Sequence, residues 1–189
     1  GRATCAARGP GAVRVAVLHL AETGTARLHR LLDPRVTGLS PQLSGAPGRQ
    51  TGLVAVHKRA AGLVHAARRT SAPASLGATE TSLGQEDVQS FGLEASAALH
   101  DALDVLRDVT SCELLAVHRG TLLDEDLPTG SGTLQMVLHQ ASEHLPTGVE
   151  DRPFGRDVGV IRHVLGVGWA YDVAPSVLDT ASHPARETP

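Results

Sequence analysis

The sequence contains ten histidines, enough to raise the question of a metal site. Zinc ligands usually come in tight pairs, such as two histidines four residues apart on one helix face. His139 and His144 are five apart, which puts them on different faces of a helix. His139 with Glu143 and His100 with Asp104 have the four-residue spacing, which is also that of a solvated surface pair. Both pairs are interpreted as surface pairs, and no metal site is predicted.

Two glycine-containing segments could approach a phosphate. Thr129–Thr133 (Thr-Gly-Ser-Gly-Thr) precedes a helical pattern and is similar to an anion-binding nest at a helix N-terminus. It lacks the lysine of a P-loop and the third glycine of a dinucleotide fingerprint, and no strand leads into it. A flexible loop with Thr133 as the helix cap explains it as well. Gly166-Val-Gly168 does not continue to a third glycine. No cofactor is predicted.

Carboxylates and nucleophiles are equally inconclusive. Asp124–Asp126 could hold Mg²⁺ or Ca²⁺, but an EF-hand loop would need glycine where Thr129 stands and glutamate where Gln135 stands. A charged surface turn is the better interpretation. Cys112 adjoins an apolar run and is predicted to be a core residue. Lys58 is the only lysine and has no glycine-rich or carboxylate neighbours. The predicted sets of catalytic, cofactor-binding and metal-binding residues are therefore all empty.

Charge and hydropathy exclude some classes of partner. The net charge of -3 and the pI near 6.4 give no electrostatic reason to expect nucleic acid or an anionic membrane. The apolar runs are far shorter than the ~20 residues that span a bilayer. The sequence shows no secretory signal, and its two cysteines fit reduced thiols, so a cytoplasmic protein is expected. Because the first residue is Gly and the only methionine is Met136, a truncated or processed N-terminus is also expected.

The elements that must position these residues are predicted from periodicity. The clearest is a helix over Glu94–Val109, whose apolar residues recur every three or four positions. Further helices are predicted at Thr25–Leu32, Ala60–Arg69 and Leu134–His144. Alternating or continuous apolar runs predict strands at Ala12–Leu20, Leu53–His57, Leu114–Val117 and Val158–Val164. The predicted fold class is α/β and loosely packed, with short strands, amphipathic helices and long coil segments that need not form one well-defined fold.

The same patterns divide the chain into five segments. They are a disordered N-terminus (1–11), a strand and helix segment (12–69), a linker rich in Ser, Thr, Ala and Gly (70–90), a helix-strand-helix core segment (91–172) and a polar tail (173–189). A structureless loop as long as the linker is uncommon inside a compact domain.

Missing residue types suggest a different kind of explanation. The chain has no asparagine, one lysine, one isoleucine and 2% aromatic residues, while the residues with GC-rich codons are abundant. On an antisense strand, codons for Val and Leu become codons for His, Asp, Glu and Gln, so hydrophobic periodicity is inherited with its faces exchanged. The low aromatic content, the ten histidines and the lack of an intact motif motivate the hypothesis that the frame is antisense. The reverse-strand reading frame tests it.

Two segments of the chain resemble a known group of sequences. Ala116–Pro128 (AVHRGTLLDEDLP) and Val158–Val173 (VGVIRHVLGVGWAYDV) resemble GC-rich reading frames labelled NAD-specific glutamate dehydrogenase. The resemblance implies an NAD-dependent enzyme with lysines that bind the substrate carboxylate and a glycine-rich nucleotide turn. The chain carries only Lys58 and no Gly-x-Gly-x-x-Gly, so no site residue is carried over.

Three functional hypotheses follow, in order of preference. The first is an uncharacterised or spurious product of a GC-rich, antisense frame with no selected activity, which would not be an enzyme. The second is a small soluble α/β domain that binds a ligand or an unidentified partner. The third is a fragment of an NAD-specific glutamate dehydrogenase.

Overall fold

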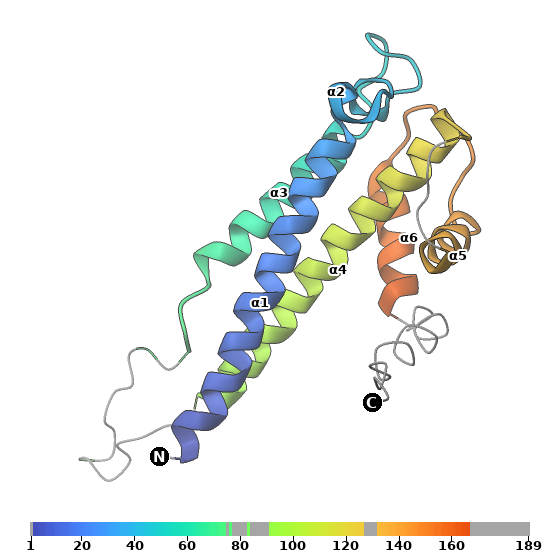
Figure 1. Ribbon diagram of the computed structural model, residues 1–189. Coiled ribbons are helices and arrows are strands. Elements are labelled where there is room, and N and C mark those ends of the chain that lie inside the picture. The colour runs from blue at the N-terminus through green and yellow to red at the C-terminus, as the bar shows by residue number, and fades with distance from the viewer. Residues whose placement is uncertain (1, 75, 77–82, 84–90, 127–131, 167–189) are drawn as a thin grey trace, which may run out of the picture. The chain divides into compact units, whose positions relative to one another are not determined.

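The computed structural model of the protein describes residues 2–74, 76, 83, 91–126 and 132–166. These residues are almost entirely helical and contain no strand, only one isolated bridge between Pro47 and Gln50 (Figure 1). The helices are α1 (Arg2–Leu31), α2 (Pro34–Thr37), the 3-10 turn η1 (Pro41–Leu43), α3 (Val54–Arg69), α4 (Gly92–Leu123), α5 (Gly132–Ser142) and α6 (Phe154–Gly166). The predicted α/β fold class is therefore wrong.

All four predicted strands are wrong, because three lie entirely within helices and the fourth lies in a helix except for its first residue, Leu53. Ala12–Leu20 belongs to α1, Leu53–His57 leads into α3, Leu114–Val117 belongs to α4 and Val158–Val164 to α6. In α1 the alternating valines do not share an environment, since Val17 is buried while Val13 and Val15 are about half exposed. Packing follows the 3.6-residue period instead, and a short apolar run cannot by itself distinguish a strand from a buried helix segment.

The predicted helices are confirmed in position, although α1 and α4 are far longer than expected. Glu94–Val109 lies inside α4, and Ala95, Ala102 and Val109 of its apolar stripe are buried. The helix predicted to end at Arg69 does so, with two arginines in its last turn near the negative end of the helix dipole. Pro34 ends the preceding helix and is also the first residue of α2. Asp33 is the N-cap of α2, and its side chain accepts a hydrogen bond from the backbone N–H of Arg35.

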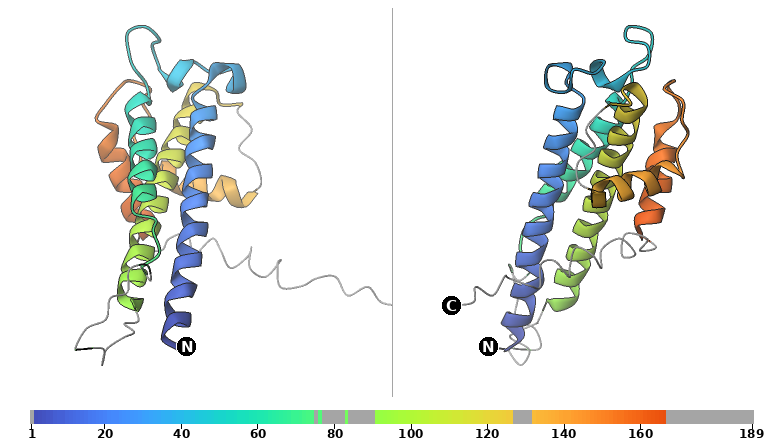
Figure 2. Two further views of the ribbon diagram at one scale, coloured as in Figure 1. Left: turned by 90° about the vertical axis from the view of Figure 1, so that its left-hand side faces the viewer. Right: turned by 45° about the vertical axis from the view of Figure 1, so that its right-hand side comes forward.

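The described residues form two compact units, of which the first comprises residues 1–30 and 55–113. In this unit α1, α3 and the first part of α4 run alongside one another (Figure 2). Val17 and Leu18 of α1 pack with Ala102 of α4 in its core. Gly24 lets α1 approach α4 closely, because a Cβ there would lie 2.8 Å from a methyl group of Val109.

The second unit comprises residues 31–54 and 114–189 and contains the last part of α4, with α2, η1, α5 and α6. Its buried side chains come from every one of these elements except α2. They include Leu43, Leu53, Leu115, Leu138, Phe154, Val158 and Ile161. The segment from residue 38 to 53, which contains η1, is held in this unit by polar contacts that are described below.

Two predicted segments lie mostly outside the described residues. These are the linker at 70–90, of which residues 75, 77–82 and 84–90 are not described, and the tail at 173–189. Among the described helices, none is both long enough and apolar enough to cross a membrane.

Candidate functional site

A groove between α1 and α3 of the first unit is the candidate functional site. Its volume is ≈ 780 Å³, within the range of roughly 300–1,000 Å³ typical of small-molecule sites. Its ionisable lining residues come from one face of each helix. They are Glu22, His29 and Arg30 from α1, and His57, His65 and Arg68 from α3.

The groove brings two imidazole rings together. The ring centroids of His29 and His57 are 5.2 Å apart and the ring planes are tilted by 34°. Burial lowers the pKa of His57 from its usual value, and the proximity of His29 lowers that pKa further. His57 is therefore predominantly neutral at neutral pH and can present a ring face to a ligand.

The single carboxylate of the groove is already paired. Glu22 accepts a hydrogen bond from Nε of Arg68 across the two helices and lies 3.2 Å from Nδ1 of His19. Among the described lining residues, Arg30 is the guanidinium for which no ion pair is found. The lining therefore carries a net positive charge that can attract an anion.

The second unit contains the most deeply buried charge of the described residues, Arg119 of α4. It is 1% exposed, and its Nε donates to the carbonyl oxygen of Leu43 at 2.6 Å. Its terminal nitrogens donate to the carbonyls of Val149 and Glu150, and its guanidinium lies 5.0 Å from the ring centroid of Phe154. These contacts satisfy backbone carbonyls of two segments far apart in the chain, so Arg119 positions both.

The counter-ion of Arg119 is Asp151, whose Oδ1 lies 3.5 Å from the guanidinium. Burial lowers the pKa of Arg119, whereas the charge of Asp151 raises it. The Asp151 carboxylate also accepts hydrogen bonds from the backbone N–H groups of Thr51 and Gly52 and from the Thr51 hydroxyl. Gly52 has φ 60 and has no room for a Cβ, which would lie 2.3 Å from the carbonyl oxygen of Gln42. The network therefore fixes the backbone of these segments.

His118, next to Arg119 in sequence, is also buried. Its Nε2 lies 3.2 Å from the carbonyl oxygen of Pro146, and its Nδ1 lies 2.9 Å from the Ser142 hydroxyl. Because a carbonyl only accepts, His118 donates from Nε2 to Pro146, while the Ser142 hydroxyl itself donates to the carbonyl oxygen of Leu138 at 2.8 Å. Burial is the largest effect on the pKa of His118 and lowers it. His118 therefore links α4 to the segment that follows α5.

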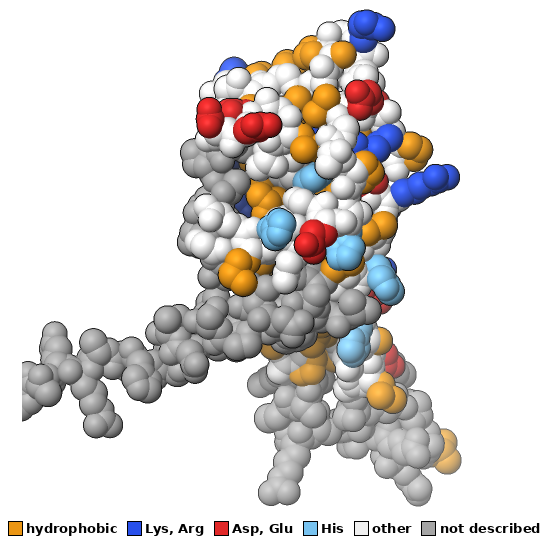
Figure 3. Space-filling view, turned by 90° about the vertical axis from the view of Figure 1, so that its right-hand side faces the viewer, with side chains coloured by type: hydrophobic (Ala, Val, Ile, Leu, Met, Phe, Trp, Pro, Cys, Tyr) orange, Lys and Arg blue, Asp and Glu red, His pale blue; other side chains and the backbone are white. Residues whose placement is uncertain are grey.

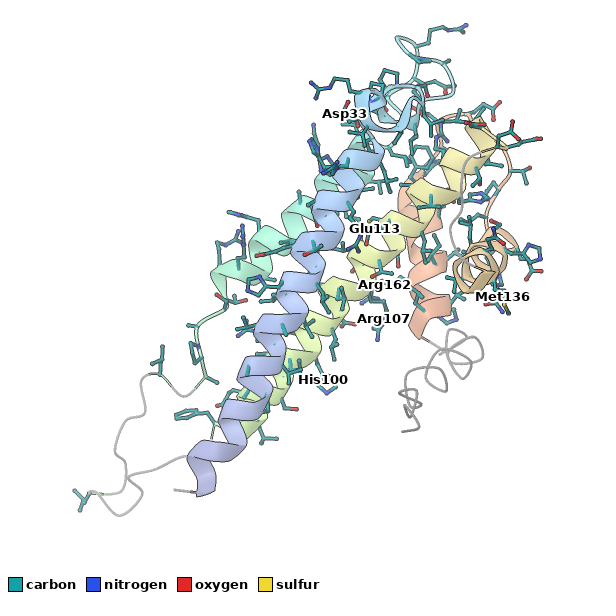
Figure 4. All side chains as sticks on the ribbon, in the orientation of Figure 1. Asp33, His100, Arg107, Glu113, Met136 and Arg162 are labelled. Carbon is teal, nitrogen blue, oxygen red and sulfur yellow. The ribbon has the colours of Figure 1, made fainter. Side chains whose placement is uncertain are left out.

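The residues singled out in the sequence are not brought together into a site. His139 and Glu143 are both exposed, with Nε2 and Oε1 3.8 Å apart, as expected of a surface pair. Asp104 forms an ion pair with Arg107 at 2.6 Å. Figure 4 labels His100 and Arg107 on α4 and Met136 on α5, and none of the three lines the groove. Lys58 is exposed and does not line the groove.

The remaining sequence candidates divide between turn, core and undescribed chain. Asp124–Asp126 is an exposed turn in which Asp124 accepts a hydrogen bond from the Asp126 backbone at 3.0 Å. Cys112 is a buried free thiol whose pKa is raised to about 12, chiefly by burial, so the prediction of a core residue is confirmed. Both glycine motifs lie partly outside the described residues, because Thr129–Ser131 of the first and Gly168 of the second are not described.

Metal chemistry finds no support in the described part of the chain. Histidine side chains are spread along the face shown in Figure 3. In the described ranges, no group of three or more His, Cys, Asp and Glu residues is arranged to hold a metal ion.

The described residues form an all-helical protein, and comparison with known proteins identifies its family. The model of the aromatic amino acid lyase family matches residues 6–143, so the chain belongs to that family. It is 31% identical over 163 residues to histidine ammonia-lyase from Bacillus thuringiensis (strain Al Hakam), covering 84% of this chain and 31% of that protein.

Solved structures show the same fold. Histidine ammonia-lyase from Trypanosoma cruzi superposes with a TM-score of 0.82 at 24% identity, covering 90% of this chain and 33% of that one. A tyrosine aminomutase from Streptomyces globisporus superposes with a TM-score of 0.82 at 23% identity, covering 90% of this chain and 32% of that one. The chain thus spans about a third of the length of the relatives it matches.

These comparisons correct the functional hypotheses drawn from the sequence. The resemblance to NAD-specific glutamate dehydrogenase is wrong, because the family model and the curated relatives are aromatic amino acid lyases. The hypothesis of a spurious antisense frame is wrong for the same reason, since the match extends over 163 residues. The preference for a protein that is not an enzyme is wrong as well, because the chain is related to ammonia-lyases, which are enzymes. The alternative of a small α/β binding domain is also wrong, since the described residues contain no strand.

Proposed function

We propose that this chain forms the helical part of an aromatic amino acid lyase that releases ammonia from an amino acid with an aromatic or imidazole side chain. The observation that carries the proposal is the 31% sequence identity with a histidine ammonia-lyase, in an alignment that covers 84% of this chain. Such an elimination breaks the bond between the α-carbon and the amino nitrogen together with a β-carbon–hydrogen bond. It releases ammonia and an α,β-unsaturated acid.

The described residues support a structural contribution to that enzyme. Arg119 and Asp151 hold backbone segments at one end of α4, and Arg59 pairs with Asp108 at 2.6 Å nearer its middle. These contacts fix long helices on which an active site can be held rigidly. No described residue is assigned to bond breaking.

The test is ammonia release by the protein purified from the cell that makes it. L-Histidine, L-phenylalanine and L-tyrosine are supplied separately, and free ammonia and the unsaturated acid are quantified together. One of the three is expected to yield both products in equal amounts. The 189-residue chain alone, which spans a third of its relatives, is the control and is expected to be inactive. A folded cellular protein that releases ammonia from none of the three amino acids contradicts the proposal.

Three predictions from the sequence accompany it. We propose that the protein is cytoplasmic, that it does not bind nucleic acid, and that residues 70–90 and 173–189 are a linker and a tail. Cell fractionation, a DNA gel-shift assay and limited proteolysis test them in turn. Cleavage that spares 70–90 while cutting α1 or α4 would contradict the last.

A further inference from the structure

The groove between α1 and α3 combines an apolar floor with a polar rim. Ala26, Ala61 and Val64 line it together with the ionisable residues, and Val64 is buried. A ligand that fills such a groove gains from burying an apolar body against the floor.

The imidazole pair favours a flat ring in that apolar body. His29 and His57 lie 5.2 Å apart, within the range of about 4.5–7 Å over which aromatic rings stack or meet edge to face. His57 is half-buried on α3, while His29 is exposed on α1, so the pair reaches from the floor to the rim. At this distance the two imidazoles already contact each other, so a planar ring in the groove packs against the pair and not between its rings.

The charges of the rim favour a carboxylate. Because Arg68 neutralises Glu22, the groove has no free carboxylate to repel an anion. Arg30 is exposed and stands next to His29 in the sequence, and its planar guanidinium can bind a carboxylate through two parallel hydrogen bonds. A divalent cation would instead meet two guanidinium groups.

We infer that this groove binds a small aromatic carboxylate, with the ring against His29 and His57 and the carboxylate on Arg30. The inference does not depend on the proposed lyase activity, because its readout is binding. The Kd is expected to be on the order of 1 mM, since the cation is exposed and the groove is open to solvent.

The test uses benzoate as the probe and two matched molecules as controls. Benzamide keeps the ring and removes the charge, whereas acetate keeps the carboxylate and removes the ring. Binding is followed by the NMR shifts of the histidine ring carbons in the folded 189-residue protein. Benzoate is expected to shift His29 and His57 and to bind at least about 10-fold more tightly than either control. Equal shifts from benzoate and acetate, or shifts confined to other histidines, would overturn the inference.

Two variants with the same change of charge identify the cation. Arg30→Gln is expected to weaken benzoate binding at least about 5-fold. Arg69→Gln, an exposed residue at the end of α3 that does not line the groove, is expected to leave binding within about 2-fold of the original. Both positions are exposed, so circular dichroism is expected to show both variants folded. An equal loss in the two variants would overturn the assignment of Arg30.

Discussion

Replacing Arg119 by alanine tests the packing of the second unit most directly. The side chain is 1% exposed, and its removal leaves the carbonyls of Leu43, Val149 and Glu150 without their donor. It also leaves Asp151 without its buried counter-ion. Breaking a buried charge pair by removing one partner typically costs about 3–5 kcal/mol. Because these contacts share one guanidinium, their separate energies do not add.

We therefore expect Arg119→Ala to lower the free energy of unfolding by about 4 kcal/mol. For a chain of this size, ~1 kcal/mol corresponds to a change in Tm of roughly 2–4 °C, so the Tm should fall by roughly 8–16 °C. The matched control is Arg27→Ala. Arg27 donates two hydrogen bonds to Glu113 at 2.8 and 3.0 Å, but it is 59% exposed, and such pairs contribute at most about 1 kcal/mol. Figure 4 labels Glu113 on α4.

Urea unfolding followed by circular dichroism measures both variants, and amide hydrogen exchange locates the effect. In Arg119→Ala, protection is expected to be lost first in residues 39–53 and 149–158, which the guanidinium and its counter-ion hold. Arg119→Lys keeps the charge but not the fork of donors and is expected to be intermediate. If Arg119→Ala costs no more than Arg27→Ala, the interpretation of Arg119 as the polar centre of this unit is refuted.

Four further predictions concern the backbone at Gly52, the thiol of Cys112 and the pH dependence of stability. Gly52→Ala should lower the free energy of unfolding by about 3 kcal/mol, measured with urea, because φ is 60 and a backbone carbonyl oxygen would lie 2.3 Å from the new Cβ. The control Gly38→Ala has φ 73 but open space around the new Cβ, so it should lower that free energy by only about 1 kcal/mol. Equal losses in the two variants would contradict the steric explanation. Cys112 should resist iodoacetamide at pH 8 until the chain is unfolded, as peptide mass spectrometry will show, because its pKa is raised to about 12. The same raised pKa makes the free energy of unfolding fall as pH rises from about 9 toward 12, since the unfolded thiol loses its proton first. Burial lowers the pKa values of His57 and His118, so on acidification the unfolded chain takes up protons before the folded protein does. The free energy of unfolding should therefore fall as pH drops below about 6.5, and it should fall less in a His118→Gln variant.

Helix periodicity was readable from the sequence, but its extent was not. The stripe through Ala95, Ala102 and Val109 predicts a helix correctly, because three- and four-residue spacing has no strand equivalent. The run at Leu114–Val117 is four apolar residues in a row, which a strand and a buried helix accommodate equally. Only the burial of Leu115 and Ala116 within the longer α4 settles it.

The groove could not be predicted while its helices were divided into strand and helix segments. Once α1 and α3 are continuous, its lining residues follow helical spacing on each. His57, Ala61, Val64, His65 and Arg68 are separated by intervals of four, three, one and three. The signal in the sequence is a stripe of ionisable residues at helical spacing, and not a close pair of ligands. Which stripe of α1 would face which stripe of α3 is a tertiary fact that no local pattern contains.

The contacts of the buried Arg119 are evidence against the antisense hypothesis, whereas hydrophobic periodicity is not. A reading frame on the opposite strand inherits the spacing of apolar residues, so an amphipathic helix alone does not show selection. Arg119 is different, because it requires carbonyl oxygens from Leu43 and Val149, about 76 and 30 residues away, at hydrogen-bonding distance. The carboxylate of Asp151 must in turn meet backbone N–H groups 100 and 99 residues away, beside a glycine at positive φ. Codon complementarity preserves no such long-range matching, and its presence agrees with the membership of this chain in the aromatic amino acid lyase family.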